Sequence, residues 1–416
     1  MKMFKKPKGT EDFYPSEQEV KNKVFEVFRK VCRKYGFLEV ETPAFETVEL
    51  LTKKSGEEIK EQLFLFKRKD KEEFGLRFDL TVPIARMFVE KQKELPKPVK
   101  WFAISRMWRY ERPQAGRLRE FYQLSVEFFG AKYAEADAEI INISIDVLKQ
   151  FGLNENDFVV KLNNRKLLEG LLLQFVKEDK VDSIIRIIDK KSKVNADEFN
   201  QMLAEAGLQL KDISKIKKIL AADTIEKIDK LEKNAIANEG FEELKQIYEM
   251  VDKRFIQLDL STARGLAYYT DAVFEVFDKN QELRSIAGGG RYDNLVELFG
   301  GQPTPATGFA MGLSTLLLLL GKKKAVPKAD IGPDYFVAIV GESARQDAMK
   351  IVAEIRKKYN VETDFLRRSL SKQITYANAI GAKNLIVIGE EEIKSGKIKV
   401  KDLKTGKESS VSISEI

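Results

Sequence analysis

Arginines gather in one short stretch of the chain, RYERPQAGRLREFYQ, which begins at Arg109. Arg109 and Glu111 are expected to alternate on a strand, so that both side chains lie on one face of a sheet. Arg112, Arg117 and Arg119 follow in a loop that also contains proline and glycine. Because a guanidinium stays charged and its fork of donors matches phosphate oxygens, the stretch predicts a nucleotide or RNA phosphate site. The alternative is a solvated basic loop beside an internal ion pair.

Residue types that bind small ligands recur further along the chain. TARGLAYYT places Arg264 close to Tyr268 and Tyr269, and the glycine-rich AGGGRYD follows. Successive glycines allow a ligand to approach the backbone closely. Each segment by itself also has a structural interpretation, since the tyrosines could be ordinary strand aromatics and GGGRYD could be a simple turn.

Two residue counts exclude several kinds of catalysis. The chain contains no histidine and a single cysteine, Cys32. A histidine general base, a Ser-His-Asp triad, an intramolecular disulfide and a metal held by His or Cys ligands are therefore excluded. Any chemistry must use arginine, lysine, carboxylates, tyrosine, serine, threonine, backbone groups or Mg²⁺.

The 416 residues are 43% hydrophobic and 33% charged, which is typical of a soluble globular protein with two or three domains. The net charge of +7 gives a modest positive field that would help to bind a polyanion. The longest aliphatic run, the leucines 316–320, is too short to cross a bilayer. The basic N-terminal segment is interrupted before an apolar core could form. We therefore expect a cytoplasmic protein without a membrane partner.

The elements that must position these residues are predicted from periodicity. Residues 18–35 have helical spacing and are followed by Gly36, a residue typical of helix ends. Two strands are expected on either side of the basic loop 112–119, and a helix is expected near residues 134–150. Residues 168–250 lose the strand patterns and show amphipathic helical periodicity, which predicts an inserted helical module.

Strand patterns return after residue 254 and end in a helix that contains the five leucines. The lysine- and proline-rich segment 323–333 is the predicted linker. Beyond it, YFVAIVG, VETDFL and NLIVIG alternate with helical segments, which predicts a small α/β domain with a mostly parallel sheet. The expected fold class is therefore α/β and α+β, in several domains.

Taken in order, these motifs resemble those of the histidyl-tRNA synthetases, a family of class II aminoacyl-tRNA synthetases, nearly from end to end. KGTEDFYP is similar to the N-terminal signature of that family, and KYGFLEVETPAFE is similar to the first class II motif. RYERPQAGRLREFYQ resembles the second motif in its histidyl form. RGLAYYT and GGGRYDNL resemble two segments peculiar to the family, and ATGFAMGL resembles the start of the third motif. RRSLSKQITYANAIGAKNLIVIGEEE resembles the C-terminal anticodon-binding domain.

The resemblance implies a class II antiparallel-sheet catalytic domain over residues 1–167 and 251–322. It also implies a helical insertion domain at 168–250, the linker at 323–333 and an α/β anticodon-binding domain at 334–416. The first motif implies a homodimer.

The implied reaction activates histidine with ATP, accompanied by Mg²⁺, and transfers it to the 3′ end of histidine tRNA. Attack of a carboxylate on the α-phosphate needs little proton transfer, so a protein without histidine can catalyse it by positioning and charge stabilisation. The resemblance implies that the catalytic residues are Arg109 and Arg264. The implied ATP-binding residues are Arg109, Glu111, Phe121 and Arg264.

The implied histidine-binding residues are Asp79, Thr81, Arg109, Gln123, Glu127, Arg264, Tyr268 and Tyr269. Imidazole presents one donor and one acceptor nitrogen, which the Glu127 carboxylate and the Tyr269 phenol can satisfy. Glu127 could instead pair with a neighbouring lysine. The candidate tRNA-binding residues are Arg112, Gln114, Arg117, Arg367, Arg368 and Lys372.

The third motif departs from the family pattern. GLSTLLLLL places Ser314 and Thr315 where glutamate and arginine are expected, and threonine can neither stack on adenine nor carry charge. Either another arginine replaces it, or adenine stacks mainly on Phe121, or ATP binding is weak or lost.

Two other functions are compatible with part of the pattern. The first is a non-catalytic paralogue that binds histidine or tRNA and regulates histidine biosynthesis, although such paralogues typically lack the anticodon-binding domain. The second is a general RNA-binding module, which leaves Arg264 and the two tyrosines unexplained.

Overall fold

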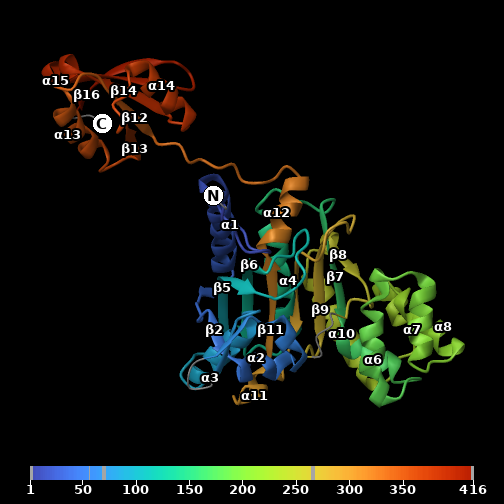
Figure 1. The fold of residues 1–416 in the computed structure, drawn as a ribbon. Helices are drawn as coiled ribbons and strands as arrows, with labels where there is room; N and C mark the ends of the chain where they lie inside the picture. The colour runs from blue at the N-terminus through green and yellow to red at the C-terminus, as the bar shows by residue number, and fades with distance from the viewer. Residues whose placement is uncertain (1–2, 56, 68–71, 264–267, 414–416) are drawn as a thin grey trace. The chain divides into compact units, whose positions relative to one another are not determined.

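The computed structural model describes the chain except for residues 1–2, 56, 68–71, 264–267 and 414–416. Arg264, a predicted catalytic residue, therefore lies outside the described residues. The chain divides into two compact units. The first comprises residues 1–12 and 22–327, and the second comprises residues 13–21 and 328–416. Figure 1 labels the elements of both.

The first unit is built on an eight-stranded sheet of order β1-β5-β6-β11-β10-β9-β7-β8. Its inner strands pair antiparallel, whereas β1 and β8 at the two edges pair parallel with their neighbours. The predicted antiparallel sheet is thus confirmed. The strands are β1 (Leu38–Glu39), β5 (Val99–Trp108), β6 (Glu120–Phe129), β7 (Phe158–Asn164), β8 (Ile256–Leu258), β9 (Ala272–Asp278), β10 (Ala287–Arg291) and β11 (Ala306–Gly312).

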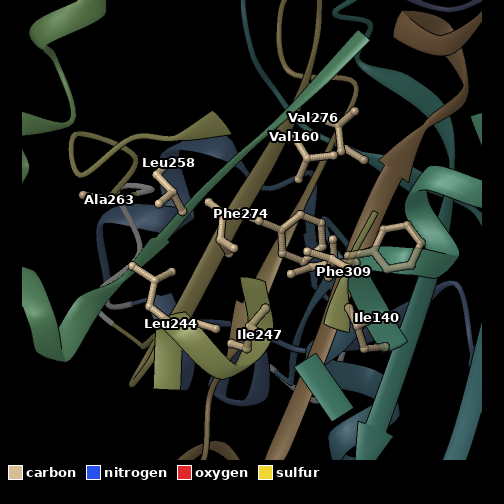
Figure 2. Packing of buried hydrophobic residues seen from close by; sticks show 14 of the residues in the cluster. Ile140, Val160, Leu244, Ile247, Leu258, Ala263, Phe274, Val276 and Phe309 are labelled. Carbon is tan, nitrogen blue, oxygen red and sulfur yellow. The ribbon is translucent and has the colours of Figure 1, made fainter. Parts of the chain in front are cut away.

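One face of the large sheet carries the main hydrophobic core. In Figure 2, Ile140 and Leu244 from two helices that cover this face lie close to Phe274 and Phe309 of the sheet. Side chains alternate along a strand, so Gln123, Ser125 and Glu127 of β6 point to the opposite face, where a second hydrophobic cluster includes Phe129. The helices around the sheet are α1 (Pro15–Lys34), α3 (Thr81–Lys91), α4 (Ala134–Lys149), α11 (Leu295–Leu298) and α12 (Leu313–Lys322).

A small three-stranded sheet of order β2-β4-β3 follows α1 and β1 in the chain. Phe45, Phe66 and Phe74 contact one another across it, with ring centroids 5.6–5.7 Å apart. Phe45 and Phe66 are nevertheless 47% and 40% exposed, which leaves an apolar surface uncovered in the single chain. The elements here are β2 (Phe45–Thr47), α2 (Val48–Ser55), η1 (Glu57–Gln62), β3 (Leu65–Lys67) and β4 (Glu73–Leu76).

Between β7 and β8 the chain forms helices, where an inserted helical module is predicted. Asparagine side chains begin three of them: Asn164, Asn195 and Asn234 each accept a hydrogen bond from the backbone N–H three residues later, at 2.9–3.1 Å. The helical elements are α5 (Arg165–Leu172), α6 (Glu178–Ile188), η2 (Lys191–Lys193), α7 (Ala196–Glu205), α8 (Leu210–Leu220), α9 (Ile225–Asp229), α10 (Ala235–Met250) and η3 (Lys253–Phe255). Among the described residues, no helix combines the length and the apolar character that a membrane crossing requires.

The second unit contains a five-stranded sheet of order β13-β12-β14-β15-β16. The first three strands pair parallel, as predicted, but β15 and β16 extend the sheet by antiparallel pairing. The prediction of a mostly parallel sheet is therefore only half right. Both added strands are largely polar, so their sequences lack the apolar runs that mark the buried parallel strands. The elements are β12 (Tyr335–Ile339), α13 (Arg345–Ile355), β13 (Val361–Thr363), α14 (Leu370–Ala379), β14 (Asn384–Ile388), α15 (Glu390–Ser395), β15 (Lys397–Asp402) and β16 (Glu408–Ser412).

Candidate active site

A cavity of about 860 Å³ lies over the polar face of the large sheet. Its volume falls within the range of about 300–1,000 Å³ that is usual for small-molecule sites. The predicted ligand-binding residues that line it are Asp79, Thr81, Arg109, Glu111, Phe121, Gln123, Tyr268 and Tyr269. Segments far apart in the sequence thus contribute to one cavity, as the motifs predict.

Arg109 lies at the cavity wall just beyond the end of β5. Its Nε donates to the Phe78 carbonyl at 2.9 Å, and its guanidinium carbon lies 5.1 Å from the centroid of the Phe121 ring. The prediction that Arg109 and Glu111 alternate on a strand is wrong, because β5 ends at Trp108 and the Glu111 N–H turns back to the Arg109 carbonyl at 2.8 Å. Both side chains still reach the cavity.

Glu111 is an anchor for the loop between β5 and β6. Its carboxylate forms an ion pair with Arg117, and its carbonyl accepts a hydrogen bond from Arg119 Nε at 3.0 Å. Gln114 and Arg117 exchange backbone hydrogen bonds of 2.9 and 3.0 Å, which closes the tip of the loop into a tight turn. Gly116 has a φ of +71° in that turn, a conformation that favours glycine.

Glu127 on β6 lies behind the cavity lining and is only 1% exposed. Its carboxylate accepts hydrogen bonds from Thr81 Oγ1 at 2.9 Å and from Ser125 Oγ at 3.1 Å. The Tyr292 hydroxyl donates to its other oxygen. Burial, followed by the charge of Glu127, raises the pKa of Tyr292, which therefore stays protonated and keeps donating. Hydroxyl donors thus stabilise a buried negative charge at the base of the cavity.

Three tyrosine rings form one wall of the cavity. The rings of Tyr268 and Tyr269 are 4.4 Å apart, and both lie about 6 Å from the ring of Tyr292. Glycines make this packing possible. A Cβ at Gly308 would lie 2.2 Å from the Tyr292 hydroxyl, and a Cβ at Gly290 would lie 2.9 Å from the Tyr269 ring. The glycines are therefore needed for the shape of the site. They belong with Arg291 to the central strand β10, and Tyr292 and Asp293 follow its end, so GGGRYD is more than the simple turn of the alternative interpretation.

Asp79, Thr81 and Gln123 occupy neighbouring parts of the cavity lining. The Asp79 carboxylate accepts a hydrogen bond from the Val82 N–H at 3.2 Å, which holds it at the beginning of α3. Gln123 is 6% exposed and lies two residues before Ser125 and four before Glu127, on the same face of β6. The oxygens of these side chains are suitable acceptors for an ammonium group.

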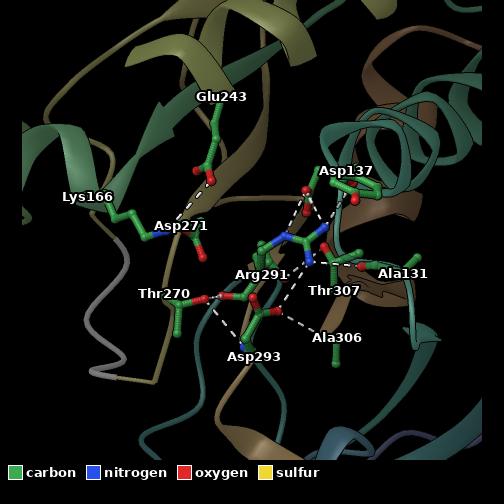
Figure 3. A network of polar contacts seen from close by, with 12 residues as sticks. Ala131, Asp137, Lys166, Glu243, Thr270, Asp271, Arg291, Asp293, Ala306 and Thr307 are labelled. Carbon is green, nitrogen blue, oxygen red and sulfur yellow. Dashed lines mark hydrogen bonds and ion pairs between the residues drawn. The ribbon is translucent and has the colours of Figure 1, made fainter. Parts of the chain in front are cut away.

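A buried polar network holds β10 against α4, next to the tyrosine wall (Figure 3). Arg291 donates from Nε and Nη2 to one oxygen of Asp137 at 2.9 and 2.6 Å, and its Nη1 contacts Asp293 at 3.2 Å. Burial raises the pKa of Asp137 to about 6 in spite of this arginine. Arg291, Tyr292 and Asp293 are consecutive in the chain. The contacts of Arg291 and Asp293 therefore hold the backbone on both sides of Tyr292.

Tyr292 and the Arg291 network are absent from the sequence-based predictions. The signal that could have found them is the same GGGRYD string, in which only the glycines suggest a role in ligand binding. A buried arginine needs a buried acid, but the partner Asp137 lies far away in the sequence on an ordinary amphipathic helix. Only the fold connects the two.

Thr315 belongs to the first turn of α12 and is 7% exposed. Its Oγ1 donates to the Gly116 carbonyl at 3.3 Å, so it supports the tip of the loop that carries Arg117. Thr315 and Ser314 both contribute to the cavity lining without any charge.

The remaining predicted residues lie elsewhere. Arg112 and Gln114 are exposed on the β5–β6 loop and are not part of the cavity lining. In the second unit, Arg367 is exposed and contacts Glu342 at 3.3 Å, whereas Arg368 pairs with Asp364 at 2.9 Å. Lys372 is exposed on α14.

Comparisons with known proteins identify the family of the chain. Residues 9–316 match the protein family described as Histidyl-tRNA synthetase, and residues 334–416 match the anticodon binding domain. The chain is 39% identical to the histidine–tRNA ligase of Haloarcula marismortui, over 99% of this chain and 96% of that protein. It is 38% identical to the histidine–tRNA ligase of Pyrococcus furiosus, over 100% of this chain and 98% of that protein.

The fold is also similar to that of a solved histidyl-tRNA synthetase structure. The crystal structure of histidyl-tRNA synthetase from Nostoc sp. PCC 7120 superposes with a TM-score of 0.84 at 27% identity, over 100% of this chain and 99% of that one. Sequence relatives and structure thus agree over the full length. The chain belongs to the histidyl-tRNA synthetase family.

Proposed function

We propose that this chain activates histidine with ATP and transfers the histidyl group to the 3′ end of histidine tRNA. The observation that carries the proposal is one cavity whose lining combines two chemically different sets of side chains, arginines and tyrosines, with Glu127 directly behind the tyrosines. Arg109 and Arg117 offer guanidinium groups suited to phosphate, while Glu127 and the tyrosine wall offer groups suited to imidazole.

The first step forms a mixed anhydride. An oxygen of the histidine carboxylate attacks the α-phosphorus of ATP, the bond to the β-phosphate oxygen breaks, and pyrophosphate leaves together with the Mg²⁺ that accompanies ATP as substrate. Arg109 would stabilise the charge on the α-phosphate and orient the carboxylate, and Arg264 is proposed to do the same from the other side. No proton has to move in this step, so the absence of histidine is no obstacle.

Recognition of histidine is proposed to use the polar end of the cavity. Asp79, Thr81 and Gln123 supply acceptors for the α-ammonium group, and Glu127 with Tyr269 satisfies the two imidazole nitrogens. A polar site of this kind rejects analogues that lack the matching groups, because its own buried groups would then remain unpaired.

In the second step, a ribose hydroxyl of the terminal tRNA adenosine attacks the histidyl carbonyl, and the bond from that carbonyl to the phosphate oxygen breaks. AMP leaves, and its phosphate takes up the hydroxyl proton. Arg112, Gln114, Arg367 and Lys372 are proposed as tRNA contacts because their side chains are exposed. Arg117, also expected to contact tRNA, is proposed as a phosphate ligand instead, because it lines the cavity. Arg368 is a weaker candidate, because Asp364 already pairs with its guanidinium. This reaction would place the protein in the cytoplasm, where transfer RNA is charged.

A homodimer is part of the proposal. Leu38, in the segment that resembles the first motif, is 67% exposed, and Phe45 and Phe66 nearby are 47% and 40% exposed. Exposed apolar side chains gathered in this way are typical of a surface that a second copy covers. Sedimentation of the purified chain would measure the oligomeric state directly.

The regulatory paralogue has no observation in its favour. Such a protein typically lacks the anticodon-binding domain, whereas residues 334–416 of this chain match one.

Histidine-dependent exchange of pyrophosphate into ATP tests the proposed activation step. Two hydrogen bonds to charged groups contribute about 1.5–3 kcal/mol each, so Arg109→Gln should lower the exchange rate about 100-fold to 10,000-fold. Arg264→Ala should abolish exchange for the same reason while the protein stays folded by circular dichroism.

Arg106→Gln is the matched control, because Arg106 lies on β5, shortly before Arg109, but pairs with Glu120 at 2.9 Å and does not line the cavity. Its exchange rate should equal that of the unmodified chain. A charging assay on total tRNA completes the test. An unmodified chain that binds histidine but neither exchanges pyrophosphate nor charges tRNA would contradict the proposal and favour the paralogue.

A further inference from the structure

Thr315 leaves the cavity without the arginine that the third motif usually supplies. Its hydroxyl is already engaged with the Gly116 carbonyl, and the side chain is almost fully buried. It can therefore contribute neither charge nor an aromatic stacking surface to ATP. The compensating group must come from another part of the cavity lining.

Among the described cations that line the cavity, most are already held by the protein. Lys161 pairs with Asp259 at 3.0 Å, and Lys193 pairs with Asp189 at 3.4 Å. Arg117 pairs with Glu111. Arg109 donates to the Phe78 carbonyl and stacks on Phe121.

Arg284 differs from these cations. It lines the cavity, it is exposed, and it forms no hydrogen bond or ion pair with the described residues. Burial, followed by the charges of Arg284 and Arg109, lowers the pKa of Arg117. The positive charges of the two other arginines therefore repel that of Arg117. Among the described lining residues, Glu111 is the acid that pairs with Arg117. Arginines gathered around one carboxylate leave positive charge that an anion of the ligand can neutralise.

The loop that carries Arg284 joins β9 to β10 and is held firmly at its start. The Asp278 carboxylate accepts hydrogen bonds from the Glu282 N–H at 3.1 Å and from the Leu283 N–H at 2.8 Å. Gln281, between Asp278 and Glu282, has a φ of +55°, which makes the chain turn sharply. The backbone that precedes Arg284 is therefore fixed before any ligand arrives.

The same loop is attached to the helix that bears Thr315. Glu282 forms an ion pair of 2.6 Å with Lys322 on α12, and the Gly312 N–H, at the beginning of that helix, donates to the Ile286 carbonyl at 3.1 Å. Arg284 thus lies on a short loop whose two sides are attached to the two ends of α12. This arrangement brings an arginine to the part of the site from which the third-motif arginine is missing.

We propose that Arg284 binds the β- and γ-phosphates of ATP and supplies the positive charge that Thr315 cannot. The inference rests on the proposed activation of histidine with ATP and names one further ligand-binding residue for it. Arg284 and Arg117 together form the binding site for the pyrophosphate portion, which leaves when histidyl-adenylate forms.

Steady-state pyrophosphate exchange by the full-length chain tests this role. A charged hydrogen bond corresponds to about a tenfold to 100-fold change in binding, so Arg284→Gln should raise the KM for ATP by that factor. The KM for histidine should stay the same. Arg284→Lys keeps the charge and should recover most of the affinity. Arg254→Gln, which alters an exposed arginine outside the cavity lining, is the control and should behave as the unmodified chain.

Inhibition by AMP shows which part of ATP the arginine contacts, because AMP lacks the β- and γ-phosphates. Arg284→Gln should leave the inhibition constant of AMP unchanged while the KM for ATP rises. An equal loss for AMP and ATP would overturn the proposal in favour of a contact to adenine or the α-phosphate. An unchanged KM for ATP with a raised KM for tRNA would overturn it in favour of an RNA contact.

The outcome for the unmodified chain keeps the two proposals distinguishable. If the unmodified chain shows no exchange, the proposed function fails. If it is active and Arg284→Gln has an unchanged KM for ATP, the role of Arg284 alone is wrong.

Discussion

Glu127 shows how a charge can be kept in a nearly closed site. An isolated carboxylate at 1% exposure would favour its neutral form, since burial penalises charge. Hydroxyls of Thr81, Ser125 and Tyr292 donate to it instead, and each such hydrogen bond favours the ionised form. An ionised carboxylate is a suitable acceptor for an imidazole N–H.

At the residue scale we predict that Glu127→Gln weakens histidine binding selectively. The amide keeps the size of the side chain but loses the charge, so one charged hydrogen bond of about 1.5–3 kcal/mol is lost and the KM for histidine should rise about tenfold to 100-fold. The KM for ATP should change little, because Glu127 lies with the tyrosine wall and not with the arginines. Pyrophosphate exchange at varied histidine concentration measures the effect. Equal changes in both KM values would contradict the assignment.

Some residues of the site can be predicted from the sequence, and others can be found only in the fold. Arg109, Gln123 and the tyrosine pair lie in recognisable motifs, and the fold brings them into one cavity. Tyr292 was missed because its partner, Glu127, lies far away in the sequence. Spacing along the chain predicts residues on one element, whereas contacts between distant strands depend on sheet order and register.

At the element scale, the inserted helices are attached to the sheet through a cluster of shared charges. Lys166 on α5 lies 2.7 Å from Asp271, which directly precedes β9, and 3.6 Å from Glu243 on α10 (Figure 3). Asn164 also donates to Glu243 at 3.0 Å. Burial, followed by the negative charge of Asp271, raises the pKa of Glu243 to about 7. Lys166 also contacts Glu239 at 2.8 Å, so one lysine serves three carboxylates, and Glu243 is the one that tends to keep a proton.

This raised pKa predicts a stability that falls as the pH rises. In the unfolded chain Glu243 loses its proton near pH 4.5, whereas the folded state holds it until about pH 7. The stabilising contribution is therefore complete below pH 4.5 and is lost as the pH rises through 7. Glu243→Gln should remove this loss and make the protein more stable at pH 8, by about 1 kcal/mol once the partial exposure of the side chain is considered.

Thermal unfolding of both proteins between pH 5 and pH 8 measures the difference. The midpoint of the variant should exceed that of the unmodified chain at pH 8, and the gap should narrow toward pH 5. Glu242→Gln alters the exposed neighbour on the same helix and should show no such trend. A gap that is constant with pH would contradict the assignment to Glu243.

The sequence predicts whole elements better than their ends and partners. Apolar periodicity identifies the helix with the five leucines and the strands on either side of the basic loop. The sequence does not mark the end of β5 at Trp108, because the next residues continue the alternating pattern of a strand. The strand stops because the Glu111 N–H turns back to the Arg109 carbonyl. The polar strands β15 and β16 are missed for the opposite reason, since their pairing depends on an edge that the rest of the sheet provides.

At the scale of the whole molecule, activation is proposed for the first unit and recognition of the anticodon end of the tRNA for the second. The cavity is lined entirely by residues of the first unit. In the second unit, the loop after β13 carries Phe365 and Leu366, which are 66% and 70% exposed, followed by Arg367. Exposed apolar side chains beside positive charge are suited to stacking on unpaired bases and to contacts with phosphates.

We predict that the double variant Arg367→Ala, Lys372→Ala impairs charging without affecting activation. Each phosphate contact that is lost reduces the slope of log affinity against log salt by about 0.7–0.9, so tRNA binding should weaken and become less dependent on salt. Histidine-dependent pyrophosphate exchange should stay unchanged, because neither residue lines the cavity. The control removes two other exposed lysines of the same unit, Lys350 and Lys357, and so changes the net charge equally. If both double variants weakened tRNA binding to the same extent, the effect would reflect net charge alone, and the assigned contacts would be wrong.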